Sequence, residues 1–215
     1  WGMVMTGSLG GVWPVDVKKN EGDVNYEGNI SLTSSTMLAL GTTMPDFQLP
    51  DVRSGNVVDS KRLAPNQGVL VMFICRHCPY VVHVKEELAK LGSDYQGKPV
   101  SIIAISSNDA HAYPLDAPKP LAEMARELNF TFPLCYDESQ DVAKAFTAAC
   151  TPDFFLFDQH RQLVYRGQLD DSRPGNGKPV TGKDLRAALE AVLAGRPVSS
   201  EQRPSAGCNI KWKSP

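Results

Sequence analysis

The feature that most constrains the fold is a continuous apolar segment that runs directly into two closely spaced cysteines and then into an amphipathic helix. Residues 68–74 (GVLVMFI) carry no polar side chain, which is typical of a strand buried on both faces of a parallel sheet. Cys75 and Cys78 follow this strand directly. Beyond them, apolar residues recur at helical spacings of three and four: Val81, Val84, Leu88, Leu91 and Tyr95.

The rest of the chain continues the alternation of strands and helices. The apolar patterns predict an edge strand over 44–50, a buried strand over 100–106, and a hairpin formed by 154–157 and 163–166. They also predict helices over 121–128 and from Ser139 to Phe146, and a last helix that ends at Gly195. Such alternation predicts an α/β fold with a central mixed sheet and helices on both faces.

Three regions divide the chain. Residues 37–197 form the predicted domain, and 198–215 form a C-terminal tail without periodicity. Residues 1–36 lack the basic region and the continuous apolar stretch of a signal peptide. We interpret them as a flexible N-terminal arm or an extension, with an ordered arm on a partner subunit as the alternative. No apolar run approaches 18 residues, so we expect no transmembrane helix.

Charge and cysteine usage narrow the function classes. The formal net charge is -2 and no block is basic, which argues against nucleic acid and membrane surfaces as partners. The five cysteines are an odd number, and only Cys75 and Cys78 are closely spaced. This pattern favours a reducing compartment, and we expect a cytoplasmic protein.

The Cys75-Arg76-His77-Cys78 motif carries the predicted chemistry. At a strand-to-helix junction, two cysteines three residues apart reach disulfide distance, and the helix N-terminus stabilises a thiolate. Arg76 and His77 are both potential cations that we expect to lower the thiol pKa. A stabilised thiolate favours the reduced form and makes the disulfide more oxidising.

Two other interpretations of this motif remain open. The cysteines can be inert buried thiols, or they can bind zinc together with His77 and His83. Structural zinc sites usually draw on a second ligand pair at a distance, and the chain has no second CxxC and no HxxxH. We therefore predict a redox site with no bound metal and no required cofactor.

Several stretches together resemble one known family. They cover about residues 37–213 and resemble the thioredoxin superfamily on its redoxin side, where thioredoxin-like reductases meet the AhpC/TSA peroxiredoxins. More narrowly, they are similar to a bacterial subfamily of thioredoxin-like proteins. The matching stretches are 45–52, 72–83, 105–118, 136–146, 150–158, 165–174 and 207–213.

The resemblance assigns roles to individual residues. It implies that Cys75 is an exposed nucleophile, that Cys78 is a buried resolving thiol, and that Thr151 and a cis Pro152 face the motif. Their backbone would pair with an extended substrate segment in a mixed disulfide. The chain departs from the family in the strand before the motif, which lacks the usual acid; His77 is the candidate substitute for proton transfer.

Two further cysteines and one turn are secondary candidates. Cys150 lies two residues before Pro152 and either approaches the motif or serves as a small buried hydrophobe. Cys208 is either an auxiliary redox or regulatory thiol or a packed tail residue. Asn108 follows a strand end, where α/β sites form, so we expect it near the site mouth.

The resemblance and the motif together predict a thiol–disulfide oxidoreductase of antioxidant type. Its substrates would be disulfide-containing proteins, small-molecule disulfides or peroxides, with electrons from a thiol reductant. The alternative is a thiol-dependent peroxidase with Cys78 or Cys75 as peroxidatic cysteine, although the peroxiredoxin Pro-x-x-x-Thr-x-x-Cys motif is incomplete here. A third hypothesis is a binding module that uses the thioredoxin-like face or a metal.

Overall fold

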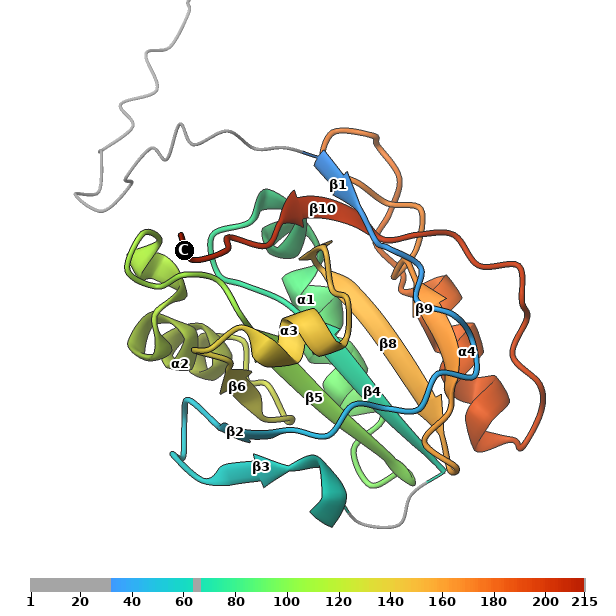
Figure 1. The fold of residues 1–215 in the computed structure, drawn as a ribbon. Helices are drawn as coiled ribbons and strands as arrows, with labels where there is room; N and C mark the ends of the chain where they lie inside the picture. The colour runs from blue at the N-terminus through green and yellow to red at the C-terminus, as the bar shows by residue number, and fades with distance from the viewer. Residues whose placement is uncertain (1–31, 64–66, 215) are drawn as a thin grey trace, which may run out of the picture.

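The computed structural model describes residues 32–63 and 67–214, and its centre is a five-stranded mixed sheet (Figure 1). The strand order is β6-β5-β4-β8-β9. β4 pairs in parallel with β5, and β5 with β6, whereas β8 and β9 are antiparallel to their neighbours. The strands are β4 (Gly68–Phe73), β5 (Val100–Ser106), β6 (Leu134–Tyr136), β8 (Asp153–Asp158) and β9 (Leu163–Gly167).

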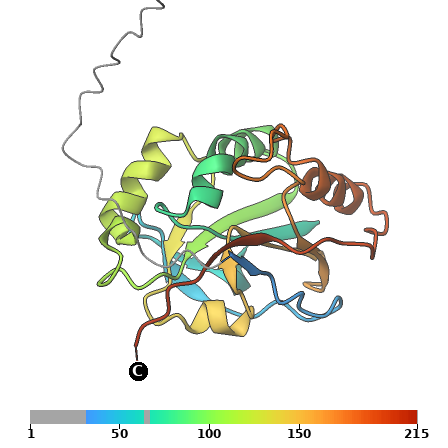
Figure 2. The same ribbon diagram turned by 90° about the horizontal axis from the view of Figure 1, so that it is seen from above.

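Helices cover both faces of this sheet, as Figure 2 shows from above. Alternate side chains of β4 enter two cores: Leu70 and Met72 pack with α1, α2 and α4, whereas Val71 and Phe73 pack with α3 and the N-terminal hairpin. The predicted α/β fold is therefore confirmed. The helices are α1 (Pro79–Asp94), α2 (Pro118–Glu127), α3 (Asp141–Ala145) and α4 (Lys183–Leu193), with short 3₁₀ turns η1 (Ser60–Arg62) and η2 (Pro114–Asp116).

The edge segment near the N-terminus differs in length from its prediction. Residues 44–50 form only a short strand, β2 (Gln48–Pro50), which pairs with β3 (Val57–Asp59) as an antiparallel hairpin. Pro50 is the last residue of this strand, and Pro45 lies three residues before its start. Proline cannot donate to a strand ladder, which limits the length of the strand. No helix in the described ranges is both long and apolar enough to cross a membrane.

A second, smaller sheet lies above the ends of the central strands. Its strands are β1 (Leu32–Ser34), β10 (Ala206–Asn209) and β7 (Cys150–Thr151), in the antiparallel order β1-β10-β7 (Figure 1). The interpretation of residues 1–36 as a flexible arm is thus wrong for 32–34. Residues 1–31 lie outside the described part of the chain.

The C-terminal tail, in which the sequence shows no pattern, is docked along most of its length. Ser205 is buried and donates its hydroxyl to the Gly167 carbonyl at 2.7 Å. Farther on, the Ile210 backbone N–H donates to the Ala149 carbonyl at 3.1 Å, and the Ile210 side chain is buried in the core. A four-residue strand with small side chains offers too little periodicity to be read from sequence.

Candidate redox site

The two motif cysteines lie where the sequence places them, between β4 and α1. Cys78 is the N-cap residue of α1, and Pro79 occupies the first helical turn, where its missing N–H costs nothing. The Val82 backbone N–H donates to the Cys78 carbonyl at 2.9 Å and closes that turn. Both cysteines are fully buried, which corrects the expectation of an exposed Cys75.

Thr151, the residue before Pro152, contacts both sulfurs. The Thr151–Pro152 peptide bond is cis, as predicted. The Thr151 hydroxyl lies 3.3 Å from Cys75 Sγ, and the Cys78 thiol donates to the Thr151 carbonyl at 3.1 Å. The two cysteines therefore meet on one residue of β7, with the helix N-terminus beside them.

The tail strand β10 covers this junction. Cys208 is paired with Thr151 in the β10–β7 register, and Cys208 Sγ lies 2.8 Å from Cys78 Sγ. A Cβ atom on Gly207 would lie 2.0 Å from the Thr151 carbonyl oxygen, so only glycine permits this approach. Because β10 pairs with Thr151, which both sulfurs contact, this strand accounts for the burial of Cys75 and Cys78.

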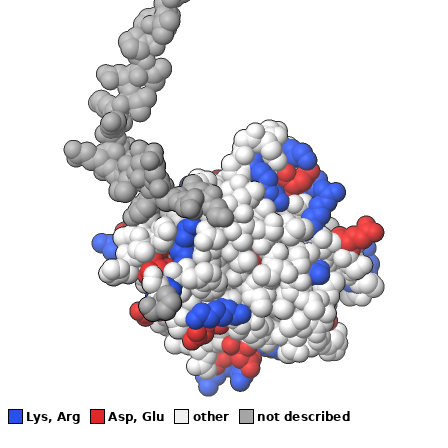
Figure 3. Space-filling view, turned by 45° about the horizontal axis from the view of Figure 1, so that its top comes forward, with Lys and Arg blue, Asp and Glu red and all other residues white. Residues whose placement is uncertain are grey.

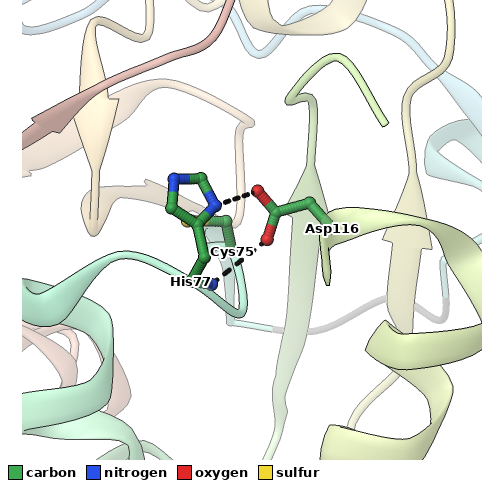
Figure 4. Close-up of side chains that lie close together, drawn as sticks. All are labelled: Cys75, His77 and Asp116. Atoms are coloured by element: carbon green, nitrogen blue, oxygen red, sulfur yellow. Dashed lines mark hydrogen bonds and ion pairs between the residues drawn. The ribbon is translucent and has the colours of Figure 1, made fainter. Parts of the chain in front are cut away.

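A buried carboxylate, Asp116 of η2, holds the residues between the cysteines (Figure 4). It accepts hydrogen bonds from the Arg76 backbone N–H at 2.7 Å, the His77 backbone N–H at 3.2 Å and the Asn108 side-chain amide at 2.8 Å. It also contacts the His77 ring at Nδ1. Sequence reasoning missed Asp116, because nothing in the 108–120 loop links its carboxylate to a motif some 40 residues earlier.

The side chains of Arg76 and His77 are both held by residues 113–127. The Arg76 guanidinium contacts the Pro120 carbonyl and pairs with Glu123 at 3.4 Å and Glu127 at 3.6 Å on α2. The His77 ring stacks on Tyr113, with centroids 5.1 Å apart. Both residues are thus engaged with the 113–127 region, and they hold the motif against it.

The thiol pKa values differ from the predicted pattern. Burial, contact with Cys78 and the Asp116 charge raise the pKa of the Cys75 thiol. For Cys78, burial opposes ionisation, but hydrogen bonds from the Cys208 and Cys75 thiols outweigh it and lower the pKa. The prediction that Arg76 and His77 lower the pKa of Cys75 is therefore wrong for this arrangement, in which burial, Cys78 and Asp116 raise it.

Three groups at this site are of types that bind metals. One ligand atom each of Cys75, His77 and Asp116 lies within 4.8 Å of the others, and zinc accepts all three residue types. Among the described residues this group has three members, whereas structural zinc usually takes four protein ligands. The Asp116 carboxylate already receives the donors named above, so the set fits a hydrogen-bonded proton relay better than a metal centre.

The other two cysteines, Cys150 and Cys135, are buried in β7 and β6. Cys150 is buried and its thiol contacts the Pro152 carbonyl at 3.6 Å. Burial and the neighbouring Asp153 charge raise its thiol pKa. Cys135 is buried in β6, where burial and Asp51 raise its pKa to about 12. Both side chains therefore behave as small buried hydrophobes.

Asp153, the residue after Pro152, is a second buried acid. It accepts hydrogen bonds from the Ser35 hydroxyl and the Phe154 backbone N–H, each at 3.2 Å. Burial nevertheless raises its pKa to about 7. An unfolded aspartate ionises near pH ~3.9, so the stability that the protonated carboxyl provides is present below about pH 4 and is lost as the pH rises to about 7.

Replacing Asp153 by asparagine should flatten this pH dependence. Asparagine keeps an acceptor for Ser35 and Phe154 but does not ionise. We expect the drop in free energy of unfolding between pH 5 and pH 8 to shrink by about 2–3 kcal/mol, measured by urea denaturation. Asp46→Asn, which removes an exposed carboxylate, is the control. An unchanged pH dependence in the Asp153 variant would contradict this assignment.

Comparison with known proteins identifies the family. The Redoxin family profile matches residues 39–187. The chain belongs to the Redoxin family. Redoxin membership agrees with the resemblance found in the sequence.

Individual proteins are also similar to this Redoxin member. An uncharacterized conserved protein from Geobacillus kaustophilus is 52% identical, with a TM-score of 0.85 over 87% of this chain and 99% of that chain. Thiol-disulfide oxidoreductase ResA from Geobacillus thermodenitrificans is 28% identical over 74% of this chain and 82% of its own length. A solved thioredoxin-like protein in the oxidised form shares the fold, with 20% identity and a TM-score of 0.58 over 74% of this chain and 99% of that chain. The fold is that of thioredoxin-like proteins, and the family is Redoxin.

Proposed function

We propose that the protein is a thiol–disulfide oxidoreductase in which Cys75 and Cys78 cycle between dithiol and disulfide. One observation carries this proposal. Both sulfurs contact Thr151, next to a cis-proline and at the N-terminus of α1. The same junction brings two thiols together, favours a thiolate and offers a backbone edge to a substrate.

The reaction proceeds by two exchanges. The Cys75 thiolate attacks one sulfur of a substrate disulfide, which forms a mixed disulfide and releases the first substrate thiol. Cys78 then attacks Cys75 Sγ, which forms the Cys75–Cys78 disulfide and releases the second substrate thiol. The two electrons that reduce the substrate come from the two cysteines. An external thiol reductant returns them by the reverse exchanges.

His77 and Asp116 are the candidates for moving the Cys75 proton. One polar atom of each lies within 4.8 Å of Cys75 Sγ, and the two side chains contact each other (Figure 4). Within the family resemblance, an acid in the strand before the motif takes this role, and here that strand is apolar. Asp116 supplies a buried carboxylate from a different element, and its contact with the His77 ring joins it to the motif.

The substrate segment is proposed to bind in extended form along Thr151. That position is occupied by β10 in the structure, so a substrate must displace the tail strand. Figure 3 brings forward the side of the molecule on which β10 lies, and much of the described surface there is uncharged. Backbone hydrogen bonds and apolar contacts would therefore bind a disulfide-containing polypeptide, and charge would contribute little. An antioxidant role and a cytoplasmic location remain parts of the same proposal.

Redox titration of the protein in glutathione buffers, with mass-spectrometric counting of alkylated thiols, tests the proposal. We expect a reversible two-electron transition that includes Cys75 and Cys78 and leaves Cys135 and Cys150 as thiols. Cys75→Ser should lose the Cys75–Cys78 disulfide, whereas Cys135→Ser should keep it. If neither motif cysteine changes over the accessible range of potentials, or if zinc is recovered with them in equal amount, the oxidoreductase proposal fails.

The peroxidase alternative is supported by the position of Cys78 as the N-cap residue of α1, where a helix N-terminus favours a thiolate. Hydrogen bonds with neighbouring thiols lower the pKa of Cys78 in the same direction. A peroxidase would oxidise Cys78 with hydrogen peroxide faster than any other cysteine in the chain. Repeating the thiol counting with hydrogen peroxide in place of oxidised glutathione separates the two reactions. Rapid peroxide consumption that depends on Cys78 would favour the peroxidase.

A further inference from the structure

We propose that Cys208 is a third redox cysteine, which β10 presents to Cys78 from the position that an extended substrate would occupy. The proposal rests on the oxidoreductase function above. Cys208 Sγ lies 2.8 Å from Cys78 Sγ, and no intervening group separates the two atoms. Cys208 is thus an intramolecular partner for the same sulfur that closes the motif disulfide.

The backbone of β10 fixes this placement. Cys208 pairs with Thr151, and Asn209 pairs with Cys150, in antiparallel register. On the outer side, β1 pairs with β10 and sets Leu32 opposite Cys208. β10 is therefore the middle strand of a sheet, held on both edges, and its cysteine is aimed at the motif by ladder hydrogen bonds.

The residues that follow β10 tie the tail to the proton-relay side of the site. The Lys211 backbone N–H donates to the Asn108 side-chain oxygen at 2.8 Å, and the Asn108 amide donates to Asp116 at 2.8 Å. The Lys211 carbonyl accepts from the Asp109 backbone N–H, also at 2.8 Å. One asparagine therefore contacts both the tail that carries Cys208 and the carboxylate that holds His77.

The exchange that this contact allows balances without an added oxidant. Starting from the Cys75–Cys78 disulfide, the Cys208 thiolate attacks Cys78 Sγ. The Cys78–Cys208 bond forms, the Cys75–Cys78 bond breaks, and Cys75 leaves as a thiolate that takes the proton lost by Cys208. The disulfide moves from the motif to the tail, which returns Cys75 to its reduced form and fixes β10 over the site.

A variant without Cys75 isolates the second half of this relay. In Cys75→Ser, Cys78 attacks oxidised glutathione and releases one reduced glutathione. Cys208 then attacks Cys78 Sγ and releases the second. Peptide mapping under non-reducing conditions should find Cys78 linked to Cys208, with no retained glutathione. The double variant Cys75→Ser/Cys208→Ser should instead keep glutathione on Cys78, and Cys75→Ser/Cys150→Ser should still form the Cys78–Cys208 link.

The same disulfides are also sought in the wild-type protein, so that the test does not depend on the folding of a variant. After oxidation by glutathione, acid quenching should trap both the Cys75–Cys78 and the Cys78–Cys208 disulfide. The Cys208 proposal is overturned if Cys75–Cys78 forms reversibly while Cys208 stays alkylatable in every protein. It is also overturned if Cys78 keeps glutathione or links to Cys150 in Cys75→Ser. Loss of the Cys75–Cys78 transition itself would instead refute the oxidoreductase proposal.

Discussion

Alanine in place of Gly207 should make Cys75 and Cys78 react with iodoacetamide about 10- to 100-fold faster than in the wild type. The added Cβ would lie 2.0 Å from the Thr151 carbonyl oxygen and 2.7 Å from its carbon. These are backbone atoms that cannot rotate away, so the strand must separate. Overpacking of this kind costs about 1–3 kcal/mol, and each ~1.4 kcal/mol raises the open population tenfold.

Mass spectrometry of the alkylated peptides gives the rate at each cysteine. Cys135, which lies in β6 away from β10, should stay as protected as in the wild type. Arg203→Ala is the control, because this side chain is exposed on the same tail. Far-ultraviolet circular dichroism shows whether the domain stays folded. Equal alkylation rates in the Gly207 variant and the wild type would mean that β10 does not cover the thiols.

Loss of the Asp116 carboxylate is expected to destabilise the protein by about 3–5 kcal/mol, the range for removing one partner of a buried charged network. In Asp116→Ala, the backbone N–H groups of Arg76 and His77 and the Asn108 amide lose their acceptor. Unpaired buried donors carry the full cost of desolvation. Urea denaturation measures the change in free energy of unfolding.

The pKa of the Cys75 thiol should also change in Asp116→Ala. The Asp116 charge contributes to the raised pKa of Cys75, so its removal should lower that pKa, measured from the pH dependence of alkylation. Glu123→Ala is the matched control, because this half-exposed carboxylate also pairs with the motif and should cost about 0–1 kcal/mol. A loss in Asp116→Ala no larger than in Glu123→Ala would show that the carboxylate does not hold the motif.

The elements that could be predicted from sequence are those with long or regular apolar patterns. β5 spans residues 100–106 as expected, and β4 ends one residue before the expected end of the run. The stripe from Val81 to Tyr95 forms α1 and its C-cap. Periodicity predicts these elements because each buries a wide face, and the strand-to-helix junction then places Cys75 and Cys78.

Contacts between distant segments could not be predicted in the same way. Asp116 reaches the motif from a short 3₁₀ turn, and Cys208 reaches it from a strand of four residues. Neither η2 nor β10 has a periodic pattern of apolar residues. Both contacts depend on tertiary structure, which brings these elements to the motif from distant parts of the sequence. The predicted effect of Arg76 on the thiols failed for the same reason, since the acids that neutralise it come from α2.

The large separation in sequence between the motif and β10 also affects the order in which the protein is expected to fold. Cys78 and Cys208 lie 130 residues apart in the sequence, and β1 pairs with β10 across a still longer separation. Closing loops of this length loses more chain entropy than forming the neighbouring β4–α1–β5 contacts, so the tail is expected to dock late. Until it docks, both motif thiols are accessible beside an already assembled sheet. We therefore expect a newly made chain to pass through a stage in which Cys75 and Cys78 are in place and its own tail strand does not yet cover them.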